Sequence, residues 1–405
     1  MTTTQLVPSH FKKFSCIGSD CENHCCQGWV VPVDKKTYKK YQNSNDKSLG
    51  KNIKRFKGNN DNLPYASIQM KECGMCPFFM ENGLCYIHST YGEEMLSSVC
   101  SVFPRVKNIF NNVLEQSLYL SCPEAARITL LNNDPMEFDL ETYEQVNLTQ
   151  IGKQDDILAG KSTLSNNFFL LRSLAIELIQ NRSWNLKIRL LLLGFWIQQL
   201  EKWEGMYLTD EEISEGWANF IFTHSELIKN GAFDSLLQDT KGIEDHFVVF
   251  IQALFSSRVK HNDTSYKYQQ LVATLLENLE WKDGTFEDWT NSYIKIKEKS
   301  SEFIQEKEYI LENFIVNEIF KDWFPFGEDS MWNHYLSIIM NFTLLRVHFM
   351  SIISETGSLN DSNIIEHVHL FVRASLHRKS FVINLIKYAK DNQMNNIGAV
   401  VLLLN

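Results

Sequence analysis

The distribution of cysteine along the chain constrains its fold more than any other feature. All nine cysteines lie within the first 122 residues, and the remaining 283 residues contain none. Cysteines used only as small apolar side chains would be spread over the whole chain. Thiols that bind a metal are instead grouped at short spacings within one compact domain. We therefore predict a metal-binding N-terminal module, with these candidate ligands: Cys16, Cys21, Cys25, Cys26, Cys73, Cys76, Cys85, Cys100 and Cys122.

Composition limits the classes of protein to which this chain can belong. Its 405 residues are enough for two or three domains, and an apolar share of 44% supports a large core. A net charge of −10 argues against nucleic acid as a partner. The N-terminus has no signal-peptide pattern, and the apolar runs 190–197 and 397–404 are too short to cross a membrane. We expect a cytoplasmic protein with no membrane partner, in which reduced thiols favour metal binding over disulfides.

The pattern of apolar residues predicts a mainly α-helical protein in two parts. Residues 1–130 are expected to form the cysteine-rich metal or iron–sulfur domain, with short strands at 28–33 and a hairpin over 106–120 that turns at Asn111-Asn112. The polar segment 131–164 is expected to be a linker. Residues 165–405 are expected to form an irregular all-α domain. Its predicted helices begin with 168–178 and 186–203, and one expected helix covers 286–320.

The spacing of the cysteines is compatible with more than one kind of metal site. Cys73 and Cys76 are separated by two residues, so both thiolates can reach one ion from a single turn, as in zinc and iron–sulfur sites. Cys25 and Cys26 are adjacent and would point to opposite faces of an extended segment, so they could serve two sites or one site and the core. The alternatives are one [4Fe–4S] cluster with a structural zinc, two clusters, or one site with spare thiols.

Other polar residues are weaker candidates for function. His88 is a possible additional ligand, and Arg105 could offset the charge of a thiolate-bound cluster, although each is as easily explained by ordinary hydrogen bonding or surface exposure. The segment 35–57 carries eight lysines and Arg55. It is interpreted either as a solvated face or as a docking surface for an acidic protein.

Several of these motifs together resemble those of a known family. The cysteine array, together with Cys100-x2-Phe-Pro-Arg105 and Ser121-Cys-Pro-Glu-Ala-Ala126, resembles the flagellin lysine-N-methylases (FliB-type), and the cysteine-rich part resembles the broader CxxxCC putative zinc- or iron-chelating domains. The segments 309–314 and 320–327 add to the likeness. The resemblance implies S-adenosylmethionine as the methyl donor and surface lysines of flagellin as the acceptors.

The residues themselves do not identify a donor site. The chain has no G-x-G turn of the Rossmann type, and Cys21-x3-Cys25 lacks the third cysteine of the radical S-adenosylmethionine motif. Tyr91, Trp323 and Phe326 could hold a sulfonium by cation–π contact, but core packing is the more common role for such residues. Glu312 and Asn313 could orient an acceptor amine or merely pair helices. The alternative function is a non-enzymatic metal-binding adaptor, or an iron–sulfur redox protein, on a helical scaffold.

Overall fold

The computed structural model describes residues 3–27, 30–56, 64–143, 151–154, 162–238, 244–259, 266–376 and 379–405. The chain divides into two compact units. The N-terminal unit comprises Met1–Ile128 and Phe138–Gln154, and the helical unit comprises Thr129–Glu137 and Asp155–Asn405. Each unit is described separately below.

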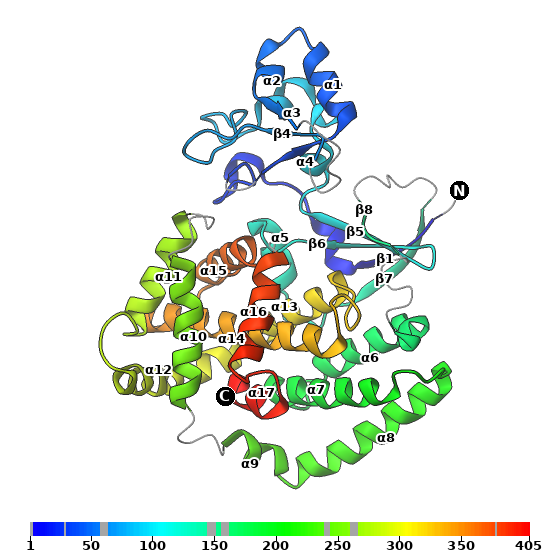
Figure 1. The fold of residues 1–405 in the computed structure, drawn as a ribbon, viewed down its shortest axis with the longest axis vertical. Helices are drawn as coiled ribbons and strands as arrows, with labels where there is room; N and C mark the ends of the chain where they lie inside the picture. Colours follow the sequence, from blue (N-terminus) through cyan, green and yellow to red (C-terminus); the bar gives the residue numbers. More distant parts are fainter. Residues whose placement is uncertain are drawn as a thin grey trace. The chain divides into compact units, whose positions relative to one another are not determined.

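A five-stranded sheet forms one part of the N-terminal unit, with the strand order β7-β1-β6-β5-β8. β1 pairs with β6 in parallel and with β7 in antiparallel orientation, and β5 and β6 form the predicted hairpin (Figure 1). Asn111 and Asn112 have φ values of 48° and 59°, the left-handed conformation that a two-residue hairpin turn requires and that asparagine tolerates. The strands are β1 (Thr3–Pro8), β5 (Arg105–Phe110), β6 (Val113–Leu118), β7 (Phe138–Tyr143) and β8 (Ile151–Lys153).

A small lobe carries seven of the nine cysteines. We call residues 18–27, 30–56 and 64–103 the cysteine lobe. Its three short strands have the order β2-β4-β3, and short helices surround them (Figure 1). Its elements are η2 (Gly18–Asp20), β2 (Pro32–Val33), α1 (Lys35–Asn43), α2 (Lys47–Lys51), β3 (Ile53–Arg55), β4 (Ala66–Ile68), α3 (Tyr86–Tyr91), η3 (Glu93–Met95) and α4 (Ser98–Val102). The remaining elements of the N-terminal unit are η1 (Ser9–Lys13) and α5 (Pro123–Leu130), which begins at a proline that needs no hydrogen-bonded N–H there.

The helical unit contains no strand among its described residues, as the apolar periodicity predicts. Its longest helices begin at polar caps; for example, Thr209 and Glu212 form a reciprocal capping box at the start of α8. The elements are η5 (Thr163–Asn167), α6 (Phe168–Gln180), α7 (Leu186–Trp203), α8 (Asp210–Lys229), α9 (Ala232–Gln238), α10 (Glu244–Val259), α11 (Tyr266–Asn278), α12 (Phe286–Glu306), α13 (Glu308–Lys321), α14 (Met331–Thr356), α15 (Asp361–Ala374), α16 (Lys379–Asp391) and α17 (Ile397–Leu404).

Helix α14 is the centre of the helical unit. It packs against helices that come before it in the chain, including α7, α11, α12 and α13, and against α15, α16 and α17, which come after it. It is long and apolar enough to cross a membrane by length and composition alone, with a mean hydropathy of 1.6 over an 18-residue window, and that window is 100% buried inside the fold. Packing within the unit therefore accounts for its apolar composition.

The prediction of a mainly helical protein with a strand-containing N-terminal part is confirmed. Three details differ from the sequence-based expectations. The helix expected over 286–320 is interrupted at Lys307, which ends α12 and precedes α13. The residues 92–103, whose sequence predicts one helix that ends before Pro104, instead form η3 and α4, separated by Leu96 and Ser97. The segment 131–164 contributes β7 and β8 to the five-stranded sheet. Of the strand expected at 28–33, Gly28 and Trp29 lie outside the described residues.

Candidate functional site

Four cysteines come together in the core of the cysteine lobe. Cys76 is 5% exposed and belongs to the core cluster, and Cys26, Cys85 and Cys100 pack against that cluster, half-buried. The cysteines fall into three groups along the sequence, at 16–26, 73–85 and 100–122. The four clustered residues come from all three groups, so the fold brings together thiols that are up to 74 positions apart. The lobe thus has the gathered thiols that the sequence predicts.

Backbone contacts fix the positions of these thiols. The Cys76 N–H donates to the Cys26 carbonyl at 2.8 Å, which joins the first and second cysteine groups directly. Cys85 forms a β-bridge with Phe79 and then precedes the first residue of α3. The Ser97 hydroxyl caps α4 by accepting from the Cys100 N–H at 3.4 Å.

The electrostatics of these thiols follow from their burial. Burial raises the pKa of Cys76 to about 11 and the pKa of Cys100 to about 12, and the charges of the Cys25 and Cys85 thiolates act in the same direction. Hydrogen bonding to Cys25, followed by burial, raises the pKa of Cys26 far above its usual range. Thiolates at these positions therefore repel one another, and a bound cation would stabilise the ionised set.

The other five cysteines are arranged differently. Cys25 is exposed, but its charge acts on Cys76 and Cys100 as well as on Cys21 and Cys122. Cys122 packs in a separate core cluster with Phe14, Leu118 and Ala125. Cys25 is thus close enough to thiols of both sets to affect their ionisation, and the division of the vicinal pair between two sites stays a prediction. Cys16 and Cys73 are both exposed.

The thiols approach one another without closing on a metal geometry. Among the residues that the structure describes, no group of three or more Cys, His, Asp or Glu side chains is arranged to hold a metal ion. The donor set nevertheless fits soft-ligand chemistry, because four thiols of a buried core are chemically suited to zinc or to an iron–sulfur cluster. The assignment of the nine cysteines as ligands stays a prediction.

The secondary candidates of the lobe and the sheet have structural contacts. His88 is exposed in the last turn of α3. The Tyr91 hydroxyl donates to Asp46 at 3.0 Å, as does the Tyr86 hydroxyl at 2.9 Å. The Arg105 guanidinium lies 5.0 Å from the centre of the Phe14 ring, in a cation–π contact. These contacts account for Tyr91 and Arg105 without a ligand.

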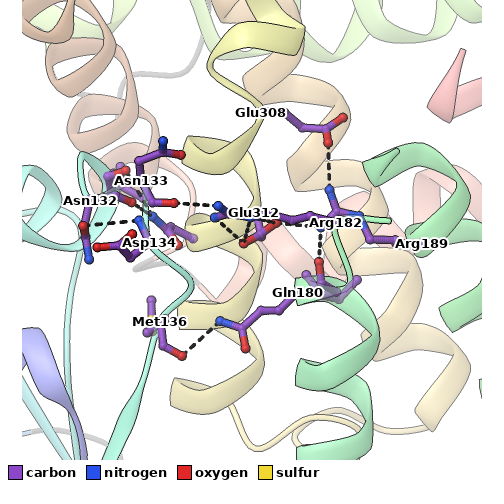
Figure 2. Close-up of polar contacts among 12 residues, drawn as sticks. Asn132, Asn133, Asp134, Met136, Gln180, Arg182, Arg189, Glu308 and Glu312 are labelled. Atoms are coloured by element: carbon purple, nitrogen blue, oxygen red, sulfur yellow. Dashed lines mark hydrogen bonds and ion pairs between the residues drawn. The ribbon is translucent and has the colours of Figure 1, made fainter. Parts of the chain in front are cut away.

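The family-like segment of α13 holds a buried ion network (Figure 2). The Glu312 side chain is 1% exposed and accepts from Arg189 at 2.6 Å and from Arg182 at 2.9 Å. Arg189 also pairs with Glu308 at 2.7 Å, and Arg182 donates to the Asn133 carbonyl at 2.7 Å. The network ties α6, α7 and α13 to the segment 129–137, so Glu312 joins helices and does not present a free carboxylate.

Asn313 completes this connection. Its amide donates to the carbonyls of Leu130 and Asn132 at 3.3 and 2.8 Å. Gln180 donates to the Met136 carbonyl at 3.0 Å (Figure 2). Of the two roles considered for Glu312 and Asn313, the structure supports the pairing of helices.

Sequence reasoning missed a second charged cluster at the end of α13. Lys321 is 4% exposed and lies 3.2 Å from Glu318 and 2.6 Å from Asp322. Burial raises the pKa of Glu318 to about 7. The available signal was the i, i+3 spacing of Glu318 and Lys321 in a helix rich in large apolar residues.

The aromatic residues that follow α13 are core residues. Trp323 and Phe326 are 0% and 3% exposed, and the ring centres of both lie within 6.4 Å of the Phe168 ring centre. Trp323 has a φ of 64°, which is uncommon for a bulky residue and requires strong packing around it. The packing interpretation of these rings therefore agrees with the structure.

The fold and the thiol arrangement define a class of protein in which a cysteine-rich unit with two small sheets is joined to a large all-helical unit. The sequence profile of the FliB lysine N-methylase C-terminal domain matches residues 172–403. That match covers more than half of the chain, so the protein belongs to the FliB lysine N-methylase family. The resemblance seen in the sequence is confirmed.

Individual relatives agree with this family. The chain is 36% identical over 147 residues to "Lysine-N-methylase" of Salmonella typhimurium, which is 35% of this chain and 36% of the relative. It is 39% identical over 137 residues to "Flagellar biosynthetic protein FliU" of Salmonella muenchen, covering 33% of this chain and 79% of that relative. The match therefore spans about a third of the curated lysine-N-methylase. No solved structure matches the chain.

Proposed function

We propose that this protein transfers a methyl group from S-adenosylmethionine to lysine side chains of flagellin in the cytoplasm. The observation that carries the proposal is the family match over residues 172–403, most of the helical unit. The names of two relatives support lysine as the acceptor and flagellin as the substrate, since one is a lysine-N-methylase and another is a flagellar biosynthetic protein. Nine free cysteines are consistent with a reducing compartment.

The chemistry sets one requirement on the acceptor. A lysine ε-amine has a reference pKa of about 10.4 and must lose its proton before its lone pair can bond to a methyl carbon. Desolvation at a protein surface favours the neutral amine. In direct transfer the N–C bond forms as the S–C bond breaks, and S-adenosylhomocysteine is released. A radical route would instead release 5′-deoxyadenosine.

We further propose that the cysteine lobe holds a metal through Cys26, Cys76, Cys85 and Cys100. Their joint packing in one core cluster supports this set, and Cys25 and the remaining thiols are the candidates for a second site. A [4Fe–4S] cluster held by all four thiolates would supply an electron, and one held by only three of them would also leave an open iron, whereas zinc would cross-link the lobe.

A methyl-transfer assay tests the activity. The protein, purified without oxygen, is incubated with isotope-labelled S-adenosylmethionine and flagellin, and flagellin peptides are then analysed by mass spectrometry. We expect labelled methyl groups on lysine, absent when flagellin lysines are acetylated beforehand. Consumption of no donor by a metal-loaded, folded protein would contradict the proposal and favour the metal-binding adaptor. Donor cleavage without methyl-lysine would favour the redox alternative.

A further inference from the structure

The cysteine lobe has one strongly basic face. Eight cationic side chains on α1, α2 and β3 are all exposed, and within 35–55 only Asp46 carries a negative charge. We call this set the basic face: Lys35, Lys36, Lys39, Lys40, Lys47, Lys51, Lys54 and Arg55. It stands out in a chain whose net charge is −10.

The geometry of α1 places four of these lysines on the solvent side. Thr37 and Tyr41 are four residues apart and buried, so they define the inward face of the helix. The lysines occupy the other positions, in two pairs spaced by one turn, and like charges at that spacing oppose helix formation. The adjacent helix α2 adds Lys47 and Lys51 (Figure 1). The clustering of these lysines therefore costs electrostatic energy through their mutual repulsion.

The two acidic residues that cap the helices of the basic face have partners within the lobe. Asp34 caps α1 by accepting from the N–H and hydroxyl of Thr37 at 2.9 and 2.7 Å. Asp46 caps α2 through Ser48 and accepts from two tyrosyl hydroxyls, and these hydrogen bonds lower its pKa to about 2.

In the part of the chain that the structure describes, no side chain of the basic face forms an ion pair. Lys40 and Lys47 donate instead to the carbonyls of Glu94 and Ser44. Individual lysines of the helical unit, such as Lys229, Lys282 and Lys307, each pair with a carboxylate. The basic face is thus distinguished by the clustering of eight exposed cations that have no ion-pair partner among the described residues.

We propose that the basic face binds an acidic segment of another protein. Clustered cations without internal counter-ions attract a segment rich in Asp and Glu and speed its encounter. The acidic balance of the rest of the chain disfavours a long polyanion such as nucleic acid, whose charge extends beyond the face. This inference goes beyond the methyl-transfer proposal, and it is tested by the binding of an acidic peptide, independently of methyl transfer.

Fluorescence anisotropy with a labelled twelve-residue Glu/Ala peptide tests the proposal on the full-length protein. We expect binding at 50 mM salt that weakens at least about tenfold at 500 mM, since salt screens exposed charges. The charge-reversal variant K36E/K40E/K47E/K51E should lose binding. The matched control K202E/K229E/K282E/K390E changes the net charge equally at exposed lysines of the helical unit and should retain it.

Two results would overturn the proposal. One is equal loss of peptide binding in both quadruple variants, or no binding to the wild type at low salt. The other is tighter binding of a single-stranded oligonucleotide of equal charge, which would assign the face to nucleic acid. The neutral variant K36Q/K40Q/K47Q/K51Q guards against misfolding, because it should weaken binding while its circular dichroism spectrum matches that of the wild type.

Discussion

At the scale of single residues, buried charges determine where the helical unit is most sensitive. Glu312 is paired with Arg189, which is 1% exposed, and with Arg182, and both arginines also contact other parts of the unit. Such a network is weak evidence of net stabilisation, because desolvating the charges opposes their attraction. Removing one charged side chain of the network is costly for stability, since the opposite charge then stays buried with fewer partners.

We therefore expect Glu312→Gln to lower the free energy of unfolding by up to about 3–5 kcal/mol, because Arg189 then keeps only the partly exposed Glu308 as a counter-ion. Urea unfolding followed by circular dichroism measures the change. The control is Glu226→Gln, which removes the exposed pair with Lys229 and should cost less than about 1 kcal/mol. Equal effects of the two substitutions would contradict the role assigned to Glu312.

A buried histidine pair gives the second prediction at this scale. The Nδ1 atoms of His348 and His367 lie 3.1 Å apart, and the rings of Phe255 and Phe371 pack against His348. Burial lowers the pKa of His367 to about 4 and the pKa of His348 well below 6.5. The unfolded chain therefore takes up protons below pH 6.5 before the folded protein does, and stability falls as the pH falls.

Between pH 6.5 and pH 5, His348→Phe should lose about 2 kcal/mol less stability than the wild type, since one buried histidine no longer contributes. Urea unfolding at a series of pH values measures this difference. The control is His88→Phe at an exposed position of α3. A pH profile of His348→Phe that coincides with the wild-type profile would show that the pair does not control acid stability.

At the scale of elements, close approach between helices is visible at one glycine. A Cβ atom on Gly194 of α7 would lie 2.6 Å from Cζ of Tyr335 on α14, and the Tyr335 hydroxyl donates to the Leu190 carbonyl at 3.0 Å. Alanine favours a helix over glycine by about 1 kcal/mol, yet overpacking a core costs about 1–3 kcal/mol. The close contact with Tyr335 therefore decides whether alanine at position 194 stabilises or destabilises the protein.

Gly194→Ala should lower the melting temperature, measured by circular dichroism, despite the better helix propensity of alanine. Gly50→Ala is the comparison, because its Cβ would meet only the flexible end of Gln42 at 3.2 Å. That variant should melt within a degree or two of the wild type. Stabilisation by Gly194→Ala would mean that α7 and α14 pack less closely than described.

Elements were predictable from the sequence where a local signal was sufficient. The asparagine turn of the hairpin and the capping box of α8 depend on neighbouring residues alone, and both are present. The helix break at Lys307 has no proline or glycine that would predict it. Strand β7 joins its sheet by pairing with β1, some 130 residues earlier in the chain. Pairings between distant segments leave no local pattern, so they could not be predicted.

At the scale of the whole molecule, the sequence predicts that cysteines cluster in the N-terminal unit, but it does not predict which cysteines pack in which core. Clustered spacing indicated a common module, and Cys26, Cys76, Cys85 and Cys100 do share one core. The placement of Cys122 in a different core depends on the tertiary fold. Sequence spacing gave no means of separating Cys73 from Cys76, although only one of them is buried.

This division predicts how metal content responds to substitution. Cys76→Ala and Cys100→Ala should each lose most of the bound iron or zinc, because each removes a member of the shared core cluster. Cys73→Ala should retain more metal than either, since Cys73 is exposed. Elemental analysis of anaerobically purified protein measures the outcome, and acid-labile sulfide distinguishes a cluster from zinc. Full metal content in both core variants would refute the assignment.

The burial of α14 has a consequence for how the chain is made. A ribosome synthesises Met331–Thr356 before α15, α16 and α17, which supply part of the cover of this helix. A polypeptide truncated just after Thr356 would lack that cover and would expose a segment as apolar as a membrane anchor. Such a truncated product would be prone to aggregate.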